Sequence, residues 1–179
     1  MVTRNVRYRP RIESLAGHPS LVATVAGWHW SEWGHVDPGG SLESWTEGLH
    51  ARTNRNRIPA TYVAFVGDEP VGSVVLVDHD MPDREDLAHL RPWLAGLFVP
   101  SEFRGLGVGS ALIRHAEAEA ARFGVTRLYL YTGIAAPLYQ RLGWTELSTT
   151  TYEGQPVSIL TKDVSKATRS DAPRAIIEG

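Results

Sequence analysis

The sequence contains no cysteine among its 179 residues. This absence excludes disulfide bonds, thiolate metal ligands and a cysteine nucleophile. The seven histidines also lack the close spacing, such as His-x-x-x-His, that is typical of metal sites. We therefore expect no metal.

Long apolar runs and a net basic charge are also absent. No stretch approaches the about 18 apolar residues of a membrane-spanning helix, so we expect no membrane partner. The formal net charge is -2, which gives no reason to expect a nucleic-acid partner. The first ten residues are rich in arginine but have no apolar segment of the signal-peptide type. These features favour a cytoplasmic location.

The composition is that of an ordinary globular protein, with 42% hydrophobic and 21% charged residues. The length suits one domain with a full core, which we assign to residues 1–164. Residues 165–179 mix charged residues, serine and proline with little apolar periodicity. They are predicted to be a flexible C-terminal tail.

Apolar periodicity predicts a mixed order of strands and helices. This order favours an α+β fold with some parallel pairing over a strictly alternating doubly wound fold. Strands are expected at residues 8–13, 61–66, 71–77, 92–99, 127–132, 144–152 and 157–162. Helices are expected at 19–35, at 41–50 with Ser41 as N-cap, from the glycine-rich turn to Gly124, and at 135–142.

The most informative segment is the glycine-rich turn after the strand at 92–99. Gly105, Gly107 and Gly109 alternate after Arg104 and lead into a helix. Such a backbone can gather N–H groups around a phosphate at the positive end of the helix. The alternative is that small residues only allow tight packing. A Walker A loop needs a lysine that is missing here, and a dinucleotide-binding oxidoreductase needs Gly-x-Gly-x-x-Gly, whose third glycine falls one position early.

The sequence Arg104-Gly-Leu-Gly-Val-Gly109 resembles the (Gln/Arg)-x-x-Gly-x-(Gly/Ala) signature of the GNAT acetyltransferases. Leu97-Phe-Val-Pro100 is similar to that family's fourth strand, and Tyr139-Gln-Arg-Leu-Gly-Trp144 to its Tyr-x-x-Leu-Gly-aromatic element. The resemblance implies a mixed central sheet flanked by helices, with a parallel strand pair splayed around an acetyl-CoA site. It also implies transfer of the acetyl group from acetyl-CoA to a primary amine. With no cysteine available, direct attack in a ternary complex is the simplest route.

By this resemblance, the backbone of Leu97, Phe98 and Val99 would pair with the pantetheine arm of acetyl-CoA. An N–H near Leu97, at a bulge typical of the family, would stabilise the oxyanion. Thr132 would be a further cofactor contact, although many relatives have asparagine there. The pyrophosphate would be held by the amides of Arg104, Gly105, Leu106, Gly107, Val108, Gly109 and Ser110.

Tyr139 aligns with the family's proton donor to the departing thiolate. A free tyrosine has a pKa of about 10 and a thiol about 8.5, so full transfer is uphill by roughly 2 kcal/mol. Unless its pKa is lowered, Tyr139 would mainly donate a hydrogen bond, and packing by its ring is the alternative interpretation. The fourth strand has no carboxylate to serve as base. Candidate bases are therefore a water chain or Glu32, Asp78, His79, Asp86 and His89.

The acceptor is predicted to be a small-molecule amine. A protein N-terminus or lysine, or a non-catalytic acyl-CoA-binding role, remains as an alternative, and a homodimer is compatible with the sequence. Periodicity predicts core positions for Trp28 and Trp45, whereas Trp30 and Trp33 could line an acceptor pocket. An acidic rim that attracts a cationic amine could come from the loop after residue 77, through Asp78, Asp80, Asp83, Glu85 and Asp86.

Overall fold

The computed structural model describes residues 9–167. Tyr8, at the start of the first predicted strand, and most of the predicted tail lie outside this range. The strands are β1 (Arg11–Ser14), β2 (Ala60–Val66), β3 (Glu69–Val77), β4 (Trp93–Phe98), β5 (Arg127–Thr132), β6 (Thr145–Tyr152) and β7 (Gln155–Asp163). The α-helices are α1 (Val22–Trp33), α2 (Leu42–His50), α3 (Val108–Arg122) and α4 (Ala136–Arg141).

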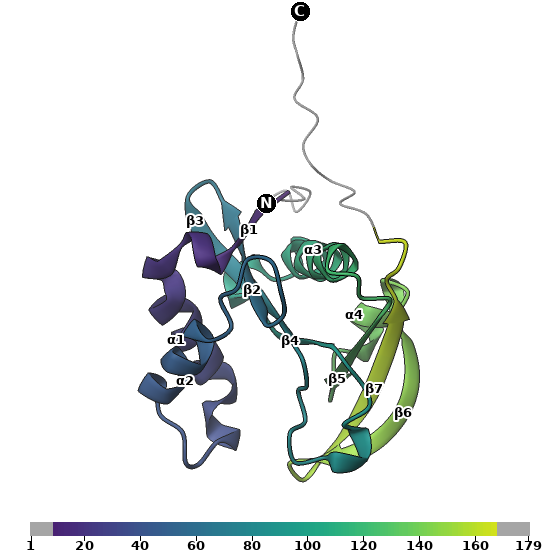
Figure 1. The fold of residues 1–179 in the computed structure, drawn as a ribbon. Helices are drawn as coiled ribbons and strands as arrows, with labels where there is room; N and C mark the ends of the chain where they lie inside the picture. Colours follow the sequence, from purple (N-terminus) through teal and green to yellow (C-terminus); the bar gives the residue numbers. More distant parts are fainter. Residues whose placement is uncertain (1–8, 168–179) are drawn as a thin grey trace, which may run out of the picture.

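The strands form one sheet in the order β1-β2-β3-β4-β5-β7-β6. Neighbouring strands are antiparallel except β4 and β5, which are parallel. The predicted α+β fold with a parallel strand pair is therefore confirmed. Figure 1 shows α1 and α2 at one side of the molecule, the β6–β7 pair at the other, and α3 between them.

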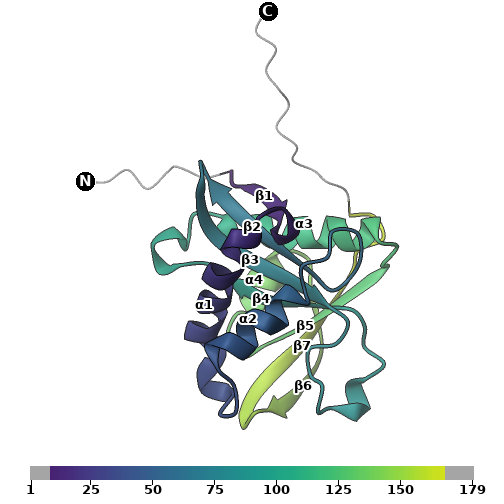
Figure 2. The same ribbon diagram turned by 60° about the vertical axis from the view of Figure 1, so that its left-hand side comes forward.

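Alternation along the strands sends side chains to two faces. From β2, Tyr62 and Ala64 join the core beneath α3, whereas Val63 and Phe65 pack against α1 and α2. Trp93 belongs to a third cluster, together with residues of β3 and β7. The helices thus cover opposite faces of the sheet, an arrangement that can be followed in the turned view of Figure 2.

Helix α3 carries an apolar stripe of buried residues that includes Val108, Leu112 and Ala116. It ends at Arg122, and Gly124, which the sequence predicts as the capping residue, follows with a left-handed backbone and a φ of 83°. The amide of Gly124 donates to Ala121 and that of Val125 donates to Ala120, which is the Schellman arrangement. The N-cap prediction for α2 is also confirmed, since the Ser41 hydroxyl accepts from the amide of Ser44.

Several boundaries differ from the sequence prediction, and two of these differences have a clear cause. The β2–β3 hairpin closes over Gly67 and Asp68, so Glu69 and Pro70 belong to β3 rather than to the turn. Gly67 has a φ of 60°, which permits so tight a connection. Helix α1 spans fewer residues than the predicted 19–35 because short 3-10 turns flank it. In residues 9–167, no helix combines the length and apolarity needed to cross a membrane.

Candidate active site

The central feature of the sheet is a split between β4 and β5. Trp93 and Tyr129 form the single register pair between these strands in the described part of the chain. Beyond this pair the two parallel strands diverge, while β4 stays bonded to β3 and β5 to β7. The facing edges of β4 and β5 therefore have backbone groups available to an extended ligand.

Strand β4 contains a bulge at the split. Ala95 pairs with Val75 and Phe98 with Ser73, so between these pairs β4 has one residue more than β3. Gly96 lies in this segment with a φ of 55°, and a Cβ there would be 3.0 Å from the Val75 side chain. Only glycine adopts this conformation readily. The glycine inside an apolar strand was the sequence signal for this bulge.

A histidine that the sequence analysis did not single out braces the bulge. His29 of α1 is buried, and its Nε2 lies 2.9 Å from the Ser73 hydroxyl. The ring also lies against Gly96, because a Cβ built on this glycine would be 3.2 Å from the His29 Cε1 atom. Burial, followed by the charge of Arg52, lowers the pKa of His29 to about 4, so the ring is neutral at pH 7. Its only sequence signal was its position on the apolar face of α1, four residues after Val25.

The glycine-rich turn follows β4. Gly105 and Gly107 have φ values of 77° and 91°, and no atom lies within 4 Å of a Cβ built on either residue. The first amide that donates a helical hydrogen bond is that of Ala111, and its acceptor is the Gly107 carbonyl. The amides of residues 105–110 make no hydrogen bond within residues 9–167, as expected for a helix N-terminus. This open, positive turn fits a pyrophosphate.

The Arg104 side chain turns back onto β4 and α1. Its Nε donates to the Val99 carbonyl at 2.8 Å, and its Nη2 lies 3.8 Å from a carboxylate oxygen of Glu32. Both charged side chains are about half exposed. Arg104 thus fixes the strand end relative to the turn, and Glu32 has this arginine as a neighbour.

Tyr139 and Thr132 lie on the β5 side of the split. The Thr132 hydroxyl accepts from the Ala135 amide at 2.9 Å, which shapes the connection into α4. Tyr139 is buried on α4, and its ring packs edge-on against Trp144 with centroids 6.0 Å apart. Burial, followed by the charge of Asp80, raises the pKa of Tyr139 well above its ordinary value. The phenol therefore keeps its proton.

A buried polar network holds Trp144, on which the Tyr139 ring packs. Glu117 of α3 accepts from the Trp144 indole at 2.7 Å and from the Lys162 ammonium at 2.7 Å. Lys162 also donates to the Leu142 carbonyl at 2.6 Å. The network joins α3, β7 and the residues that follow α4. Its members are far apart in the sequence, so no local pattern predicts it.

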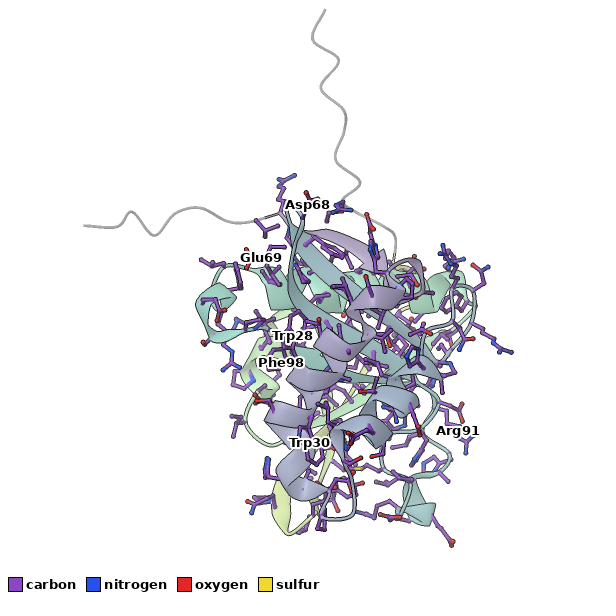
Figure 3. The ribbon with its side chains drawn as sticks, turned by 90° about the vertical axis from the view of Figure 1, so that its left-hand side faces the viewer. Trp28, Trp30, Asp68, Glu69, Arg91 and Phe98 are labelled. Carbon is purple, nitrogen blue, oxygen red and sulfur yellow. The ribbon has the colours of Figure 1, made fainter. Side chains whose placement is uncertain are left out.

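Aromatic side chains from α1 pack on Phe98, at the end of β4. Trp28 stacks on Phe98 with centroids 5.6 Å apart, and Trp33 meets the same ring edge-on at 6.5 Å. Figure 3 shows Trp28 beside Phe98, with Trp30 farther along α1. Trp30 instead contacts Trp45, whose indole donates to Asp37 at 2.8 Å. Of the two predicted pocket residues, Trp33 is the one that contacts β4.

Most of the predicted bases are engaged elsewhere. Asp78 forms an ion pair with Arg91 at 2.6 Å, and Asp86 one with Arg84 at 2.7 Å. The His79 ring lies 3.1 Å from the Leu87 carbonyl and accepts from the Met81 amide at 3.3 Å. His89 is exposed. Within residues 9–167, no three histidine or acidic side chains group as a metal site would require.

Asp80 differs from the other acids of its loop. It is partly buried, and burial raises the pKa of its carboxyl to about 7. The charge of Arg52 opposes this rise, and that of Glu153 adds to it. Asp80 in turn raises the pKa of Tyr131 on β5, beside the split. From the sequence, Asp80 was expected in an acidic rim and was not among the candidate bases.

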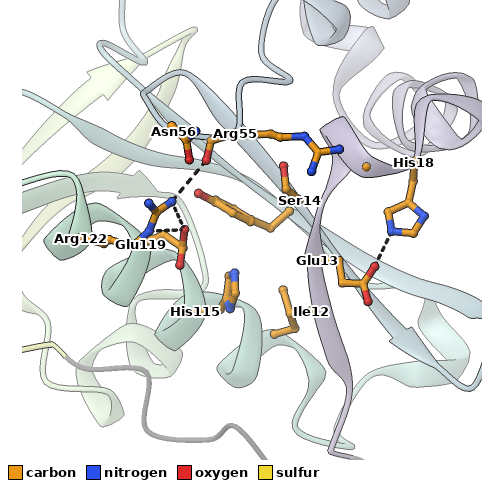
Figure 4. Close-up of a pocket in the computed structure, with 11 residues that line it drawn as sticks. Ile12, Glu13, Ser14, His18, Arg55, Asn56, His115, Glu119 and Arg122 are labelled. Carbon is orange, nitrogen blue, oxygen red and sulfur yellow. Dashed lines mark hydrogen bonds and ion pairs between the residues drawn. The ribbon is translucent and has the colours of Figure 1, made fainter.

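Two surface cavities lie away from the split. One, of about 400 Å³, is lined by residues of β1 and α3 and by the loop before β2, including Ser14, Arg55 and His115 (Figure 4). Charged groups of both signs meet there, with Arg122 2.8 Å from Glu119. The second, of about 450 Å³, lies between residues 91–92 and residues 124–129. Neither includes the glycine-rich turn or Tyr139.

The split sheet, the bulge and the glycine-rich turn together define a class of acyltransferase. Residues 22–144 match the model of the acetyltransferase (GNAT) family. The match spans more than half of the chain, and the chain belongs to this family. It is an acetyltransferase, and acetyl-CoA is its acetyl donor. No curated protein matches the sequence significantly.

Solved structures, acetyltransferases among them, have the same fold. An aminoglycoside 6'-N-acetyltransferase complexed with coenzyme A has a TM-score of 0.67 at 17% identity, covering 86% of this chain and 97% of that chain. The aminoglycoside 6'-N-acetyltransferase from Enterococcus faecium has a TM-score of 0.65 at 17% identity, covering 86% of this chain and 97% of that chain. Ard1 from Thermoplasma volcanium has a TM-score of 0.64 at 14% identity, covering 87% of this chain and 98% of that chain. At these identities the likeness concerns the fold alone.

Proposed function

We propose that this protein transfers the acetyl group of acetyl-CoA to a primary amine of a small molecule by direct attack in a ternary complex. The observation that carries the proposal is the split between β4 and β5, with the bulge at Gly96 on one side and Tyr139 on the other. The chain has no cysteine that could hold an acetyl group between two half-reactions.

The residues along β4 fit the donor. The backbone of Leu97, Phe98 and Val99 would bind the pantetheine arm in the manner of a further strand, because these residues lie beyond the last β4–β5 pair. The turn from Arg104 to Ser110 would hold the pyrophosphate through its amides. The Val99 carbonyl already accepts from Arg104, so its amide is the group left for the ligand.

The reacting carbonyl would lie at the bulge. An N–H at Leu97 would donate to the oxygen that becomes negative as the amine attacks. The neutral His29 ring holds Gly96 in place without adding a charge beside this oxygen. As the carbon–sulfur bond breaks, the Tyr139 hydroxyl donates a hydrogen bond to the sulfur. The raised pKa of Tyr139 makes complete proton transfer to a thiolate unfavourable.

A small cationic acceptor is favoured by the acids near the split. Asp80 and the exposed Glu153 are next in sequence to Met81 and Tyr152, which belong to the apolar cluster of Trp93 and Tyr131. Their negative charge would attract an ammonium group. The aminoglycoside acetyltransferases among the structural neighbours suggest the first compounds to test.

The test is release of CoA thiol from acetyl-CoA in the presence of kanamycin, spermidine or a lysine-containing peptide. We expect saturable release with kanamycin or spermidine, together with a product heavier than the acceptor by one acetyl group. If CoA thiol is released with the peptide and with neither small amine, the acceptor is a protein and not a small molecule. Acetyl-CoA binding with no release on any amine would support a non-catalytic binding role.

A further inference from the structure

The bulge of β4 depends on contacts from outside its own strand. A β-bulge disrupts the hydrogen-bonded ladder locally, so the ladder alone does not fix the orientation of its residues. This bulge lies just before Phe98, which pairs with Ser73 of β3, and it contains Gly96 and Leu97. Gly96 has a left-handed backbone with a φ of 55°, and glycine is the residue with the widest choice of other conformations. Neighbouring side chains therefore have to hold it in this one.

The His29 ring of α1 contacts both strands at the bulge. On β3, its Nε2 atom lies 2.9 Å from the hydroxyl oxygen of Ser73. On β4, a Cβ built on Gly96 would be 3.2 Å from its Cε1 atom, so the ring and the glycine are in close contact. The same Cβ would be 3.0 Å from the side chain of Val75. Gly96 thus lies against one side chain of α1 and one of β3, and both limit its movement.

His29 is itself held firmly by its surroundings. The residue is 6% exposed, and its ring meets that of Trp33 edge-on with centroids 5.3 Å apart. Trp33 in turn meets the ring of Phe98 at 6.5 Å, so one aromatic group joins α1 to the end of β4. Burial, followed by the charge of Arg52, lowers the pKa of His29 to about 4. At pH 7 the ring therefore acts through its shape and its hydrogen bond, and carries no positive charge.

We propose that His29 is a positioning residue that directs the Leu97 amide at the carbonyl oxygen of the bound acetyl group. It does so through its contacts with Ser73 and Gly96. This inference rests on the donor site of the proposed function. A fixed amide donates a hydrogen bond to the carbonyl of acetyl-CoA, and the bond strengthens as the oxygen becomes negative during attack by the amine. Without the His29 contacts the bulge would take other conformations, and the amide would point at the oxygen for less of the time.

The experiment compares acetyl-CoA with S-ethyl-CoA, the thioether in which a methylene group replaces the carbonyl. The ratio of the two Kd values, measured by calorimetry, reports the hydrogen bond to the carbonyl oxygen, because the rest of the ligand is the same. We expect the wild type to bind acetyl-CoA about tenfold more tightly than S-ethyl-CoA. In His29→Leu and in Ser73→Ala this ratio should fall below about threefold, while the Kd for S-ethyl-CoA stays within about threefold of the wild type.

Further variants separate positioning from packing. His29→Gln keeps a hydrogen-bonding group toward Ser73 and should recover part of the ratio. The double variant His29→Leu/Ser73→Ala should lower the ratio no further than either single change, because both remove the same contact. Thr161→Val is the matched control: it removes a buried hydroxyl that donates to the Leu128 carbonyl at 3.1 Å, on β7, which β5 separates from β4. It should leave the ratio unchanged. Urea denaturation checks that each variant is folded.

Steady-state kinetics give the second readout. With kanamycin or spermidine as acceptor, His29→Leu should lower kcat by about 30-fold and leave the KM for the acceptor nearly constant, because the amide acts mainly in the transition state. A ratio that stays near ten in both His29→Leu and Ser73→Ala would overturn the inference. A wild type that binds the two ligands equally would overturn it as well. A wild type that shows the expected ratio but acetylates no amine would overturn the proposed small-molecule function and still support the position of the carbonyl.

Discussion

The two sides of the split are built in different ways. On the proposed donor side, the site would be contiguous backbone: the end of β4, the glycine-rich turn and the start of α3 follow one another within residues 93–110. On the proposed acceptor side, it would be made by single side chains from separate elements, among them α1, the loop after β3, and β5. A backbone site depends on local conformation and leaves a sequence motif, whereas a side-chain site depends on tertiary packing.

The largest effect is expected from the network of Glu117, Trp144 and Lys162 next to Tyr139. Glu117→Ala removes the partner of Lys162 and of the Trp144 indole, and leaves an ammonium partly buried. We expect a loss of about 3 kcal/mol in the free energy of unfolding, measured by urea denaturation. Glu146→Ala is the control, because Glu146 is an exposed acid bonded to Ser158, and should change stability by less than about 0.5 kcal/mol. Equal losses in both variants would show that the network has no special role.

Gly107→Leu tests whether the donor site depends on backbone conformation. A leucine in the left-handed region is strained, and its side chain would extend into the open space above the turn. We expect the Kd for acetyl-CoA to rise by about 100-fold, measured by calorimetry. Gly124→Leu introduces the same strain at the other end of α3, again in open space. It should lower stability and leave the Kd within about threefold of the wild type.

Tyr139→Phe tests the proposed hydrogen bond from the Tyr139 hydroxyl to the departing sulfur. Loss of the hydroxyl should lower kcat by about tenfold, while the ring keeps its packing on Trp144 and the KM for acetyl-CoA stays nearly constant. Because the pKa of Tyr139 is raised, the wild type should lose no activity through ionisation of this phenol up to pH 9.5. An unchanged kcat in the variant would reduce Tyr139 to a packing residue.

The smallest net effect in the wild type is expected from two opposed pH dependences of stability, which largely cancel. Burial lowers the pKa of His29 from 6.5 to about 4, so its contribution to stability falls as the pH drops between these values. The pKa of Asp80 is raised from 3.8 to about 7, so its contribution falls as the pH increases between them. Each slope is at most about 1.4 kcal/mol per pH unit, and the two oppose each other from about pH 4 to 6.5.

Single variants should therefore uncover opposite slopes. In Asp80→Asn the stability should rise with pH over this interval, and in His29→Asn it should fall, as measured by urea denaturation at several pH values. Asp80→Asn should also be more stable than the wild type at pH 8 and about equal to it at pH 3. Parallel curves in the two variants and the wild type would contradict the assigned shifts.

The same contrast between local backbone conformation and tertiary packing explains which features could be predicted from the sequence. The three glycines, the apolar run of β4 and the cap at Gly124 act within a few residues, so the turn and α3 could be predicted from them, whereas the splayed strand pair was implied by the resemblance to the GNAT family. The pairing of His29 with Ser73 spans 44 residues, and that of Glu117 with Lys162 spans 45. No periodicity in the chain indicates such contacts. In the sequence, Asp80 is one of several acids in its loop, and its burial depends on tertiary packing.

The most direct test of this account is amide hydrogen exchange with and without acetyl-CoA. Binding at the split predicts slower exchange in peptides that cover residues 97–99 and 105–110, because those amides would donate to the pantetheine arm and the pyrophosphate. Peptides at the cavity beside β1, including residues 12–18, should exchange at the same rate in both samples. Protection at that cavity, with none along residues 97–110, would contradict the placement of the donor between β4 and β5.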